Sequence, residues 1–259
     1  MDLNLAGKTA LITGGSKGIG LAVARLLAAE GCSLHLAART EADLIAARDE
    51  LNQTHGAQVT IHAADLSDGD RMRQLASDTA GIDILVNNAG AIPFGNIEMV
   101  DEETWRNAWD LKVLGYVNLI RAVYPAMIAR KSGAIVNVLG TAGERPTPSY
   151  LAGSMGNASL MAMTVALGGE SLGQGVRVVG VNPGLIETER MMTMNKARAV
   201  AKFGDETRWR EFLADMPQAR AGAPEEVADL VAFLASDRAS WISGTIVTID
   251  GGVTKRATL

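Results

Sequence analysis

The segment from Thr9 to Gly20 constrains this chain most strongly. Its first four residues are apolar enough to predict a short buried strand, and the next are rich in glycine. A helical pattern of apolar residues then runs from Ile19 to Glu30. Glycine lets a backbone approach a ligand closely, and the start of a helix offers free N–H groups and a partial positive charge. This order of strand, glycine turn and helix predicts a phosphate cradle for a nucleotide.

Strand and helix patterns alternate along the rest of the 259 residues. Further strands are expected at 33–38, 58–63, 82–86, 134–139, 175–182 and 244–249, and helices at 41–52, at 101–130 and from Pro224 onward. This alternation predicts an α/β fold, with a parallel sheet covered by helices on both faces. No linker or repeat interrupts it, so a single domain is expected over residues 1–259.

Composition excludes several classes of partner. The net charge of −5 gives no reason to expect nucleic acid or an anionic membrane surface. No apolar stretch is expected to be long enough to span a membrane, and no secretory signal is expected from the first residues. The lone Cys32 excludes an intramolecular disulfide and fits a reducing compartment, so a cytoplasmic location is expected.

The segment 187–218 is the least sheet-like part of the chain and is rich in methionine and charge. We expect it to form helices over the carboxyl ends of the strands, where ligands bind in such folds. Two interpretations stay open. The segment is either a substrate-covering lid with an adaptable apolar wall or a packed surface excursion.

Five short motifs follow one another along the chain. They are Thr13-Gly14-x-x-x-Gly18-x-Gly20, Asp65-Leu66, Asn87-Asn88-Ala89-Gly90, Pro183-Gly184 with Thr188, and Asp250-Gly251-Gly252. Together they resemble the short-chain dehydrogenase/reductase family over nearly the whole chain. The resemblance implies a Rossmann-type doubly wound sheet of about seven parallel strands. It also implies a nicotinamide dinucleotide, a small-molecule substrate, and a homo-oligomer that is a tetramer or a dimer.

The resemblance gives each motif a task. Asp65 would accept a hydrogen bond from the adenine amino group, Asn88 to Gly90 would border the adenine ribose, and Pro183 to Thr188 would hold the nicotinamide carboxamide. The residues expected to contact the cofactor are Gly14, Ser16, Lys17, Gly18, Ile19, Gly20, Arg39, Asp65, Leu66, Asn88, Ala89, Gly90, Pro183, Gly184, Ile186 and Thr188.

The end of the second strand indicates which dinucleotide is bound. NAD sites usually place a carboxylate there for the ribose hydroxyls, whereas this strand ends Ala37-Ala38-Arg39. Arg39 and Lys17 are suited to flank a 2′-phosphate, Arg39 by a forked contact. We therefore predict NADP(H); the alternative is that both cations are solvated.

The family's usual catalytic residues, Asn, Ser, Tyr and Lys, are missing from their positions. Counting forward without gaps from the Asn87 motif puts Lys112 at the Asn position and Gly140 at the Ser position. The same count puts Gly153 at the Tyr position and Asn157 at the Lys position, and counting back from Pro183 gives these last two positions again.

Three residues are candidate replacements. Thr147-Pro148 is typical of a helix start, which would place Tyr150 inside the helix, one turn before Gly153. That spacing resembles the Tyr-x6-Lys arrangement of the superfamily's enoyl reductases. We predict a catalytic pair of Tyr150 with Lys112, and a hydrogen bond to substrate from Thr141. Alternatively, Tyr150 only covers the pocket mouth, and Lys112 is exposed or paired with Asp110 or another neighbouring carboxylate.

Three functions follow. The first is NADP(H)-dependent hydride transfer to or from a carbonyl, an alcohol or an activated double bond, with a non-standard active site. The second is a dinucleotide-binding protein with weak or no activity, acting as a sensor or a structural subunit. The third is a non-redox lyase or isomerase with a bound cofactor. The three histidines lack metal-ligand spacing, so no metal is expected.

Overall fold

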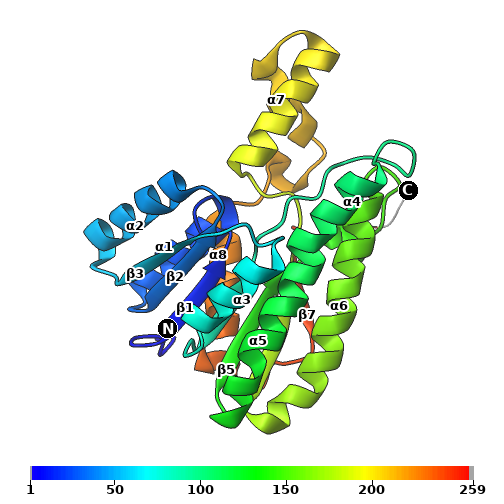
Figure 1. Ribbon diagram of the computed structural model, residues 1–259. Helices are drawn as coiled ribbons and strands as arrows, with labels where there is room; N and C mark the ends of the chain where they lie inside the picture. Colours follow the sequence, from blue (N-terminus) through cyan, green and yellow to red (C-terminus); the bar gives the residue numbers. More distant parts are fainter. Residues whose placement is uncertain (1, 257–259) are drawn as a thin grey trace.

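The computed structural model describes residues 2–256, and the strands form one parallel sheet. Its seven strands lie in the order β3-β2-β1-β4-β5-β6-β7. They are β1 (Thr9–Thr13), β2 (Ser33–Ala38), β3 (Val59–Ala63), β4 (Ile84–Asn87), β5 (Gly133–Val138), β6 (Val176–Pro183) and β7 (Ile246–Ile249). The chain builds outward from β1 to β3 and then crosses to β4, so the direction reverses between β1 and β4 (Figure 1). The predicted doubly wound α/β fold is confirmed.

Helices cover both faces of this sheet (Figure 1). They are α1 (Gly18–Ala29), α2 (Glu41–His55), α3 (Gly69–Asp78), α4 (Glu102–Trp109), α5 (Gly115–Ala129), α6 (Leu151–Ser171), α7 (Glu189–Phe203) and α8 (Pro224–Ala235). The first apolar cluster joins the sheet to α1, α2 and α8, and the second joins it to α3 and α5.

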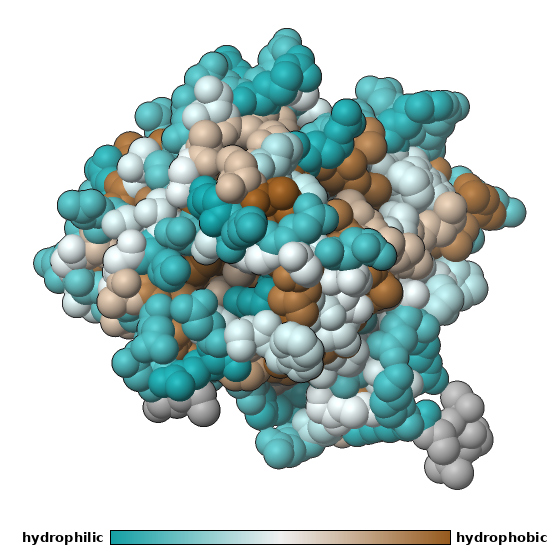
Figure 2. Space-filling view, turned by 90° about the horizontal axis from the view of Figure 1, so that it is seen from below, coloured by the Kyte–Doolittle hydropathy of each residue, from teal (hydrophilic) through white to brown (hydrophobic). Residues whose placement is uncertain are grey.

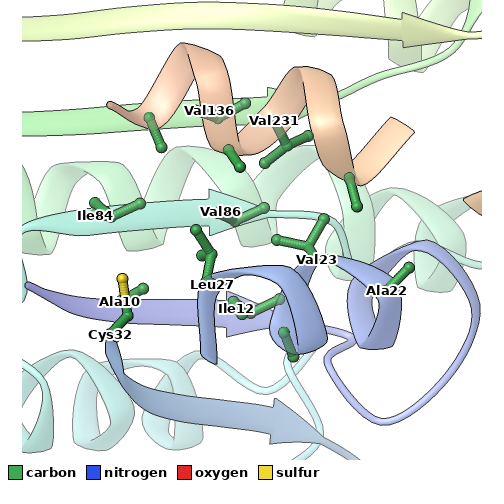
Figure 3. Packing of buried hydrophobic residues seen from close by; sticks show 14 of the residues in the cluster. Ala10, Ile12, Ala22, Val23, Leu27, Cys32, Ile84, Val86, Val136 and Val231 are labelled. Atoms are coloured by element: carbon green, nitrogen blue, oxygen red, sulfur yellow. The ribbon is translucent and has the colours of Figure 1, made fainter. Parts of the chain in front are cut away.

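Successive residues of β1 supply opposite faces of the sheet. Ile12 belongs to the first cluster, where it packs with Val23 and Leu27 of α1 and Val231 of α8 (Figure 3). Leu11 belongs to the second cluster. Because parallel strands are buried on both faces, they read as continuous apolar runs in the sequence. This explains why the expected strands lie within two residues of the observed ones.

Helix α3 was absent from the sequence expectations. It is polar, and only Met72, Leu75 and Ala76 are buried, so its apolar pattern is thin. It begins where the Asp68 side chain accepts hydrogen bonds from the N–H groups of Asp70 and Arg71. The cap, rather than apolar periodicity, marks this helix in the sequence.

The long helix expected at 101–130 is interrupted by a π-helical turn, η1 (Asp110–Leu114), between α4 and α5. Within the described residues, the run Glu102–Ala129 is long and apolar enough to span a membrane by length and composition alone. We expected no stretch of that length. A core helix passes the same test, and Leu119, Ile120 and Val123 of α5 pack in the second cluster on the sheet.

Residues 189–219 form a helical lobe above the carboxyl ends of the strands (Figure 1). Helix α7 packs on the 3₁₀-helix η4 (Glu206–Leu213) through a cluster of its own that includes Met191, Trp209 and Leu213. The segment is helical, as expected, and its role as a substrate cover stays a prediction. Figure 2 views the molecule from the side away from this lobe, where apolar and hydrophilic residues are interspersed.

Candidate active site

The turn between β1 and α1 accepts only glycine at three positions. Gly14 and Gly18 have φ of 65° and 54°, in the left-handed region that L side chains rarely adopt. At Gly20, a Cβ atom would lie 2.1 Å from the carbonyl oxygen of Gly14. The turn is therefore as tight as the sequence predicts.

Helix α1 begins without a side-chain cap. The residue before it, Lys17, is extended and makes no capping hydrogen bond, and the first turn contains no acidic residue. The first N–H groups of an uncapped helix and its partial positive charge favour a bound phosphate. Thr188 lies beside this turn, since a Cβ at Gly18 would be 3.2 Å from its Cγ2. These features fit the diphosphate of a dinucleotide.

Thr13 ties this turn to the end of β4. Its Oγ1 accepts hydrogen bonds from the N–H groups of Asn88 at 2.9 Å and Ala89 at 3.0 Å. In return, Asn88 Nδ2 donates to the carbonyl oxygens of Thr13 at 3.0 Å and Gly14 at 3.3 Å. Two of the sequence motifs are thus held together by one hydroxyl, a role that the sequence analysis did not assign.

Asp65 begins a turn of its own. Its Oδ1 accepts from the N–H of Ser67 at 3.0 Å and from the Ser67 hydroxyl at 2.7 Å. These hydrogen bonds hold the pKa of the Asp65 carboxyl below its usual value. The turn fixes the carboxylate at the end of β3, and its contact with adenine stays a prediction.

The two cations expected at the 2′-phosphate differ in their surroundings. Lys17 forms an ion pair with Asp43 at 3.0 Å, which raises the pKa of its amine. Arg39 is exposed just beyond β2. Arg39 is therefore the better candidate for a phosphate contact.

The other expected cofactor residues lie along the same sheet edge, and their ligand contacts stay predictions. Ser16 and Ile19 are half-buried in the turn and in α1, and Leu66 and Ile186 are buried on opposite faces. Pro183 ends β6, and Gly184 follows it.

Lys112 is buried, which rules out the exposed alternative. The π-helical turn η1 directs it inward, and its Nζ donates to the carbonyl oxygen of Leu139 at 2.9 Å. Burial and the charge of Arg190 lower the pKa of Lys112 to about 8.

Two of the three other positions of the expected active site lie together at the end of β5. Next to Leu139, a Cβ at Gly140 would be 3.2 Å from Nδ2 of Asn157. Thr141 follows directly and opens a short 3₁₀-helix. The ungapped count therefore places Lys112, Gly140 and Asn157 in one neighbourhood.

Tyr150 is not inside helix α6, so the expected helix start at Thr147 is wrong. Helix α6 begins at Leu151, and Tyr150 is its N-cap residue, with φ of −141°. The segment before it is a turn, in which the Tyr150 N–H donates to the Thr147 carbonyl oxygen, and a β-bridge joins Tyr150 to Gly95. The ring nevertheless lies over Gly153, where a Cβ would be 2.1 Å from two ring carbons. Phe94 packs on the ring, with centroids 4.5 Å apart.

The expected pair of Tyr150 and Lys112 is not joined by a hydrogen bond within residues 2–256. Burial raises the pKa of the Tyr150 phenol, and the charge that opposes this effect belongs to Arg190. Arg190 is not among the residues predicted from the sequence. Its guanidinium donates to the carbonyl oxygens of Ile92 at 2.9 Å and Gly90 at 3.4 Å. The feature of the sequence that could have pointed to Arg190 is its position two residues after Thr188, at the start of α7.

No group of three or more His, Cys, Asp or Glu side chains in the described part of the chain is arranged to hold a metal ion. His35 and His62 pair across β2 and β3, with Nδ1 and Nε2 2.9 Å apart. Burial lowers the pKa of both imidazoles. His35 lies inside β2, and His62 is the last residue but one of β3.

Known proteins resemble this chain over nearly its whole length. A family model described as enoyl-(acyl carrier protein) reductase matches residues 14–254. The 3-oxoacyl-(acyl-carrier-protein) reductase FabG of Chlamydia trachomatis is 31% identical over 253 residues, covering 96% of this chain and 98% of the relative.

Solved structures agree in fold over the whole length. The L-sorbose reductase of Gluconobacter frateurii, complexed with NADPH and L-sorbose, is 33% identical with a TM-score of 0.92 and covers 99% of this chain and 100% of its own. A putative NAD(P)-dependent gluconate 5-dehydrogenase from Beutenbergia cavernae, with bound NADP, is 30% identical with a TM-score of 0.87 and the same coverage. The chain belongs to the short-chain dehydrogenase/reductase family of NAD(P)-dependent oxidoreductases that act on carbonyl or alcohol groups.

Proposed function

We propose that the protein is an NADP(H)-dependent reductase of a small carbonyl compound, in which Tyr150 supplies the proton from a non-standard position. The observation that carries this proposal is the overlap of the Tyr150 ring with the space above Gly153. Gly153 is where the family's tyrosine is expected, so the phenol of Tyr150 enters the same region from the preceding turn. An activated double bond is the alternative substrate.

The cofactor preference rests on Arg39. No carboxylate ends β2, and an exposed guanidinium suits a phosphate better than two hydroxyl groups. Of the solved relatives described above, one binds NADPH and one NADP. When bound, NADPH supplies the hydride. The glycine turn, the start of α1 and Thr188 would hold it.

The state of the phenol favours reduction over oxidation. Burial keeps the Tyr150 hydroxyl protonated at neutral pH, because it raises a pKa that is already far above 7. A protonated phenol can donate to the oxygen of a carbonyl as it becomes an alkoxide. The hydroxyl of Thr141, beside Gly140, is suited to hold that oxygen. Lys112 adds positive charge close to the end of β5.

The same site also favours a second function, dinucleotide binding with weak or no activity. Gly140, Gly153 and Asn157 carry none of the acid–base groups that the family usually has at those positions. A dinucleotide-binding sensor or structural subunit with weak or no activity needs the cradle but not those groups. Non-redox lyase or isomerase chemistry with a bound cofactor is a third outcome that an assay distinguishes.

The test follows NADPH oxidation against a panel of ketones, quinones and enones. We expect turnover by the wild type and a loss of about 10²-fold or more in kcat for Tyr150→Phe, as for removal of a general acid. Tyr124→Phe, on α5, is the matched control and should keep its activity. NADPH binding without turnover of any compound supports the binding protein. Product formation without oxidation of the cofactor supports the third function.

We also propose a cytoplasmic homo-oligomer, a dimer or tetramer. Large apolar side chains are exposed on the helical layer that includes α4 to α6, among them Leu114, Met155 and Val165. An apolar groove between α5 and α6 is lined by Tyr124, Met163 and Leu167. Exposed apolar faces of this kind suit pairing with a second copy. Light scattering of the purified protein tests the assembly.

A further inference from the structure

Two cations from distant parts of the chain meet at Gly90. The aliphatic stem of Lys112 packs on this residue, since a Cβ at Gly90 would be 2.8 Å from the Lys112 Cδ. Arg190 reaches the other side of Gly90 from α7 and donates to its carbonyl oxygen at 3.4 Å. A second bond from Arg190 to the Ile92 carbonyl oxygen at 2.9 Å fixes the guanidinium. Both cations therefore belong to the edge of the sheet where β4 ends.

Neither cation has a carboxylate partner within residues 2–256. No ion pair involves Lys112 or Arg190, although nine other pairs occur on the described surface. The charge that acts on the buried Lys112 amine is the like charge of Arg190. Burying an ammonium beside a second cation costs free energy, so stability alone does not explain this arrangement.

Both side chains keep donors free for a ligand. An ammonium has three N–H donors, and Lys112 uses one on the Leu139 carbonyl oxygen. A guanidinium has five, and Arg190 uses two on backbone oxygens. Nearby, the buried Asn157 Oδ1 has no hydrogen-bond partner. Such an amide oxygen marks a polar position that a ligand or water completes.

Two of the neighbouring positions are occupied by glycine. Gly140 and Gly153 carry no side chain, and the ring of Tyr150 lies over Gly153. The cations lie at the ends of β4 and β5, whereas the expected diphosphate cradle lies at the start of α1. The donors of Lys112 and Arg190 are therefore separate from those of the diphosphate cradle, but Gly90 is also expected to border the cofactor ribose, so a ligand held by both cations would lie beside the cofactor.

We propose that Lys112 and Arg190 bind the carboxylate of the substrate, so that the protein reduces an oxo acid. This inference rests on the proposed reductase function and names its substrate class. A carboxylate between the two cations neutralises their repulsion. It also places the carbonyl group of the same molecule close to Tyr150, whose phenol is within the electrostatic influence of Arg190.

The experiment compares α-, β- and γ-oxo acids with their methyl esters, which differ in charge at the same carbon skeleton. For at least one acid, kcat/KM with NADPH should exceed that of its ester by about tenfold or more, as for a charge-assisted hydrogen bond. Lys112→Met and Arg190→Gln should each remove most of this preference, chiefly by raising KM for the acid. Arg190→Lys should restore part of it.

The ester separates charge recognition from other effects. A variant that only loosens α7 or the end of β5 lowers the rates for acid and ester alike, and that result would overturn the inference. Equal rates for acids and esters in the wild type would overturn it too. Lys8→Met, a lysine before β1 at the opposite edge of the sheet, is the control for loss of surface charge.

A binding measurement separates this inference from the reductase proposal. If no compound is turned over, calorimetry of the same acids and esters with the NADP⁺-loaded protein still tests the anion site. Binding of an acid but not its ester, lost in both charge-removing variants, supports the site while the reductase proposal fails. Turnover of neutral ketones without any preference for acids supports the reductase proposal and overturns the anion site.

Discussion

The phenol ring of Tyr150 lies so close to Gly153 that a Cβ there would be 2.1 Å from two ring carbons. Only glycine at 153 lets the ring take this place. We therefore expect Gly153→Ala to displace the ring and to lower kcat by about 10²-fold, similar to the loss of a general acid. Steady-state kinetics of Gly153→Ala, Tyr150→Phe and the double variant would check this. The double variant should be no worse than Tyr150→Phe, because both changes remove the same group.

Gly169→Ala is the matched control on the same helix. Its Cβ would meet no atom within 4 Å, so the change should keep full activity. It should stabilise the protein by about 0.5–1 kcal/mol, because alanine favours a helix over glycine. Full activity in Gly153→Ala as well would show that the ring position does not matter to the reaction.

Thr13 holds the glycine turn against the end of β4 by accepting two backbone N–H groups. Thr13→Val keeps the shape of the side chain but leaves both donors without a partner in a buried place. We expect a loss of about 2–4 kcal/mol in the free energy of unfolding and weaker cofactor binding. Denaturant titration and calorimetry would measure the two effects. Thr13→Ser keeps the hydroxyl and should retain most of both; equal losses in the two variants would contradict the assigned role.

Arg39 is expected to decide between the two dinucleotides. In Arg39→Gln, the Kd for NADPH should rise by about 10- to 100-fold, because a charge-assisted contact to the 2′-phosphate is lost. The Kd for NADH should stay nearly unchanged. Lys17→Met should have a smaller effect, since Asp43 already occupies its amine. An Arg39 variant that loses both dinucleotides equally would indicate local unfolding instead.

The buried charge of Lys112 should lower the free energy of unfolding of the protein. Its folded pKa is lowered to about 8 from 10.5, so the unfolded chain binds more protons between these values, and stability rises with pH across that window. Below pH 8 the full cost of the buried charge is present. Lys112→Met should therefore stabilise the protein by about 1–3 kcal/mol at pH 7, after allowance for the lost hydrogen bond to Leu139.

The pH dependence makes this prediction specific. The advantage of Lys112→Met should shrink as the pH rises above 8 and disappear above about 10.5. Thermal unfolding of both proteins across this range would measure it. A destabilised Lys112→Met at pH 7 would mean that the amine mainly supports the end of β5.

The sheet and the glycine turn could be predicted because local sequence determines them. The strands of a parallel sheet are apolar on both faces, and Gly14, Gly18 and Gly20 are required by backbone geometry within a few residues. The start of α6 could not be predicted in the same way. Thr147-Pro148 has the local chemistry of a helix start, but the chain first makes a turn, in which the Tyr150 N–H donates to the Thr147 carbonyl oxygen, and then bridges to Gly95, so the helix begins only at Leu151.

The candidate site was only partly predictable for the same reason. An ungapped count along the chain found Lys112, Gly140, Gly153 and Asn157. Arg190 comes from α7, and its contacts with Gly90 and Ile92 join residues about 100 positions apart. Nothing within a short window of sequence reports such a contact.

The π-helical turn η1 has a consequence for how this protein can be altered. A π-turn carries one residue more than the α-helical path it replaces. Removing one residue from η1 would therefore straighten the helix but rotate either α4 or α5 by about 100° relative to its partner surface. If α5 keeps Leu119 and Val123 on the sheet, α4 must turn, and Trp109 loses its hydrogen bond to the Ala152 carbonyl oxygen. The extra residue of η1 thus helps to hold Lys112 in its buried position, in addition to the contacts of Lys112 itself. A deletion in η1 would therefore disturb the packing of both helices.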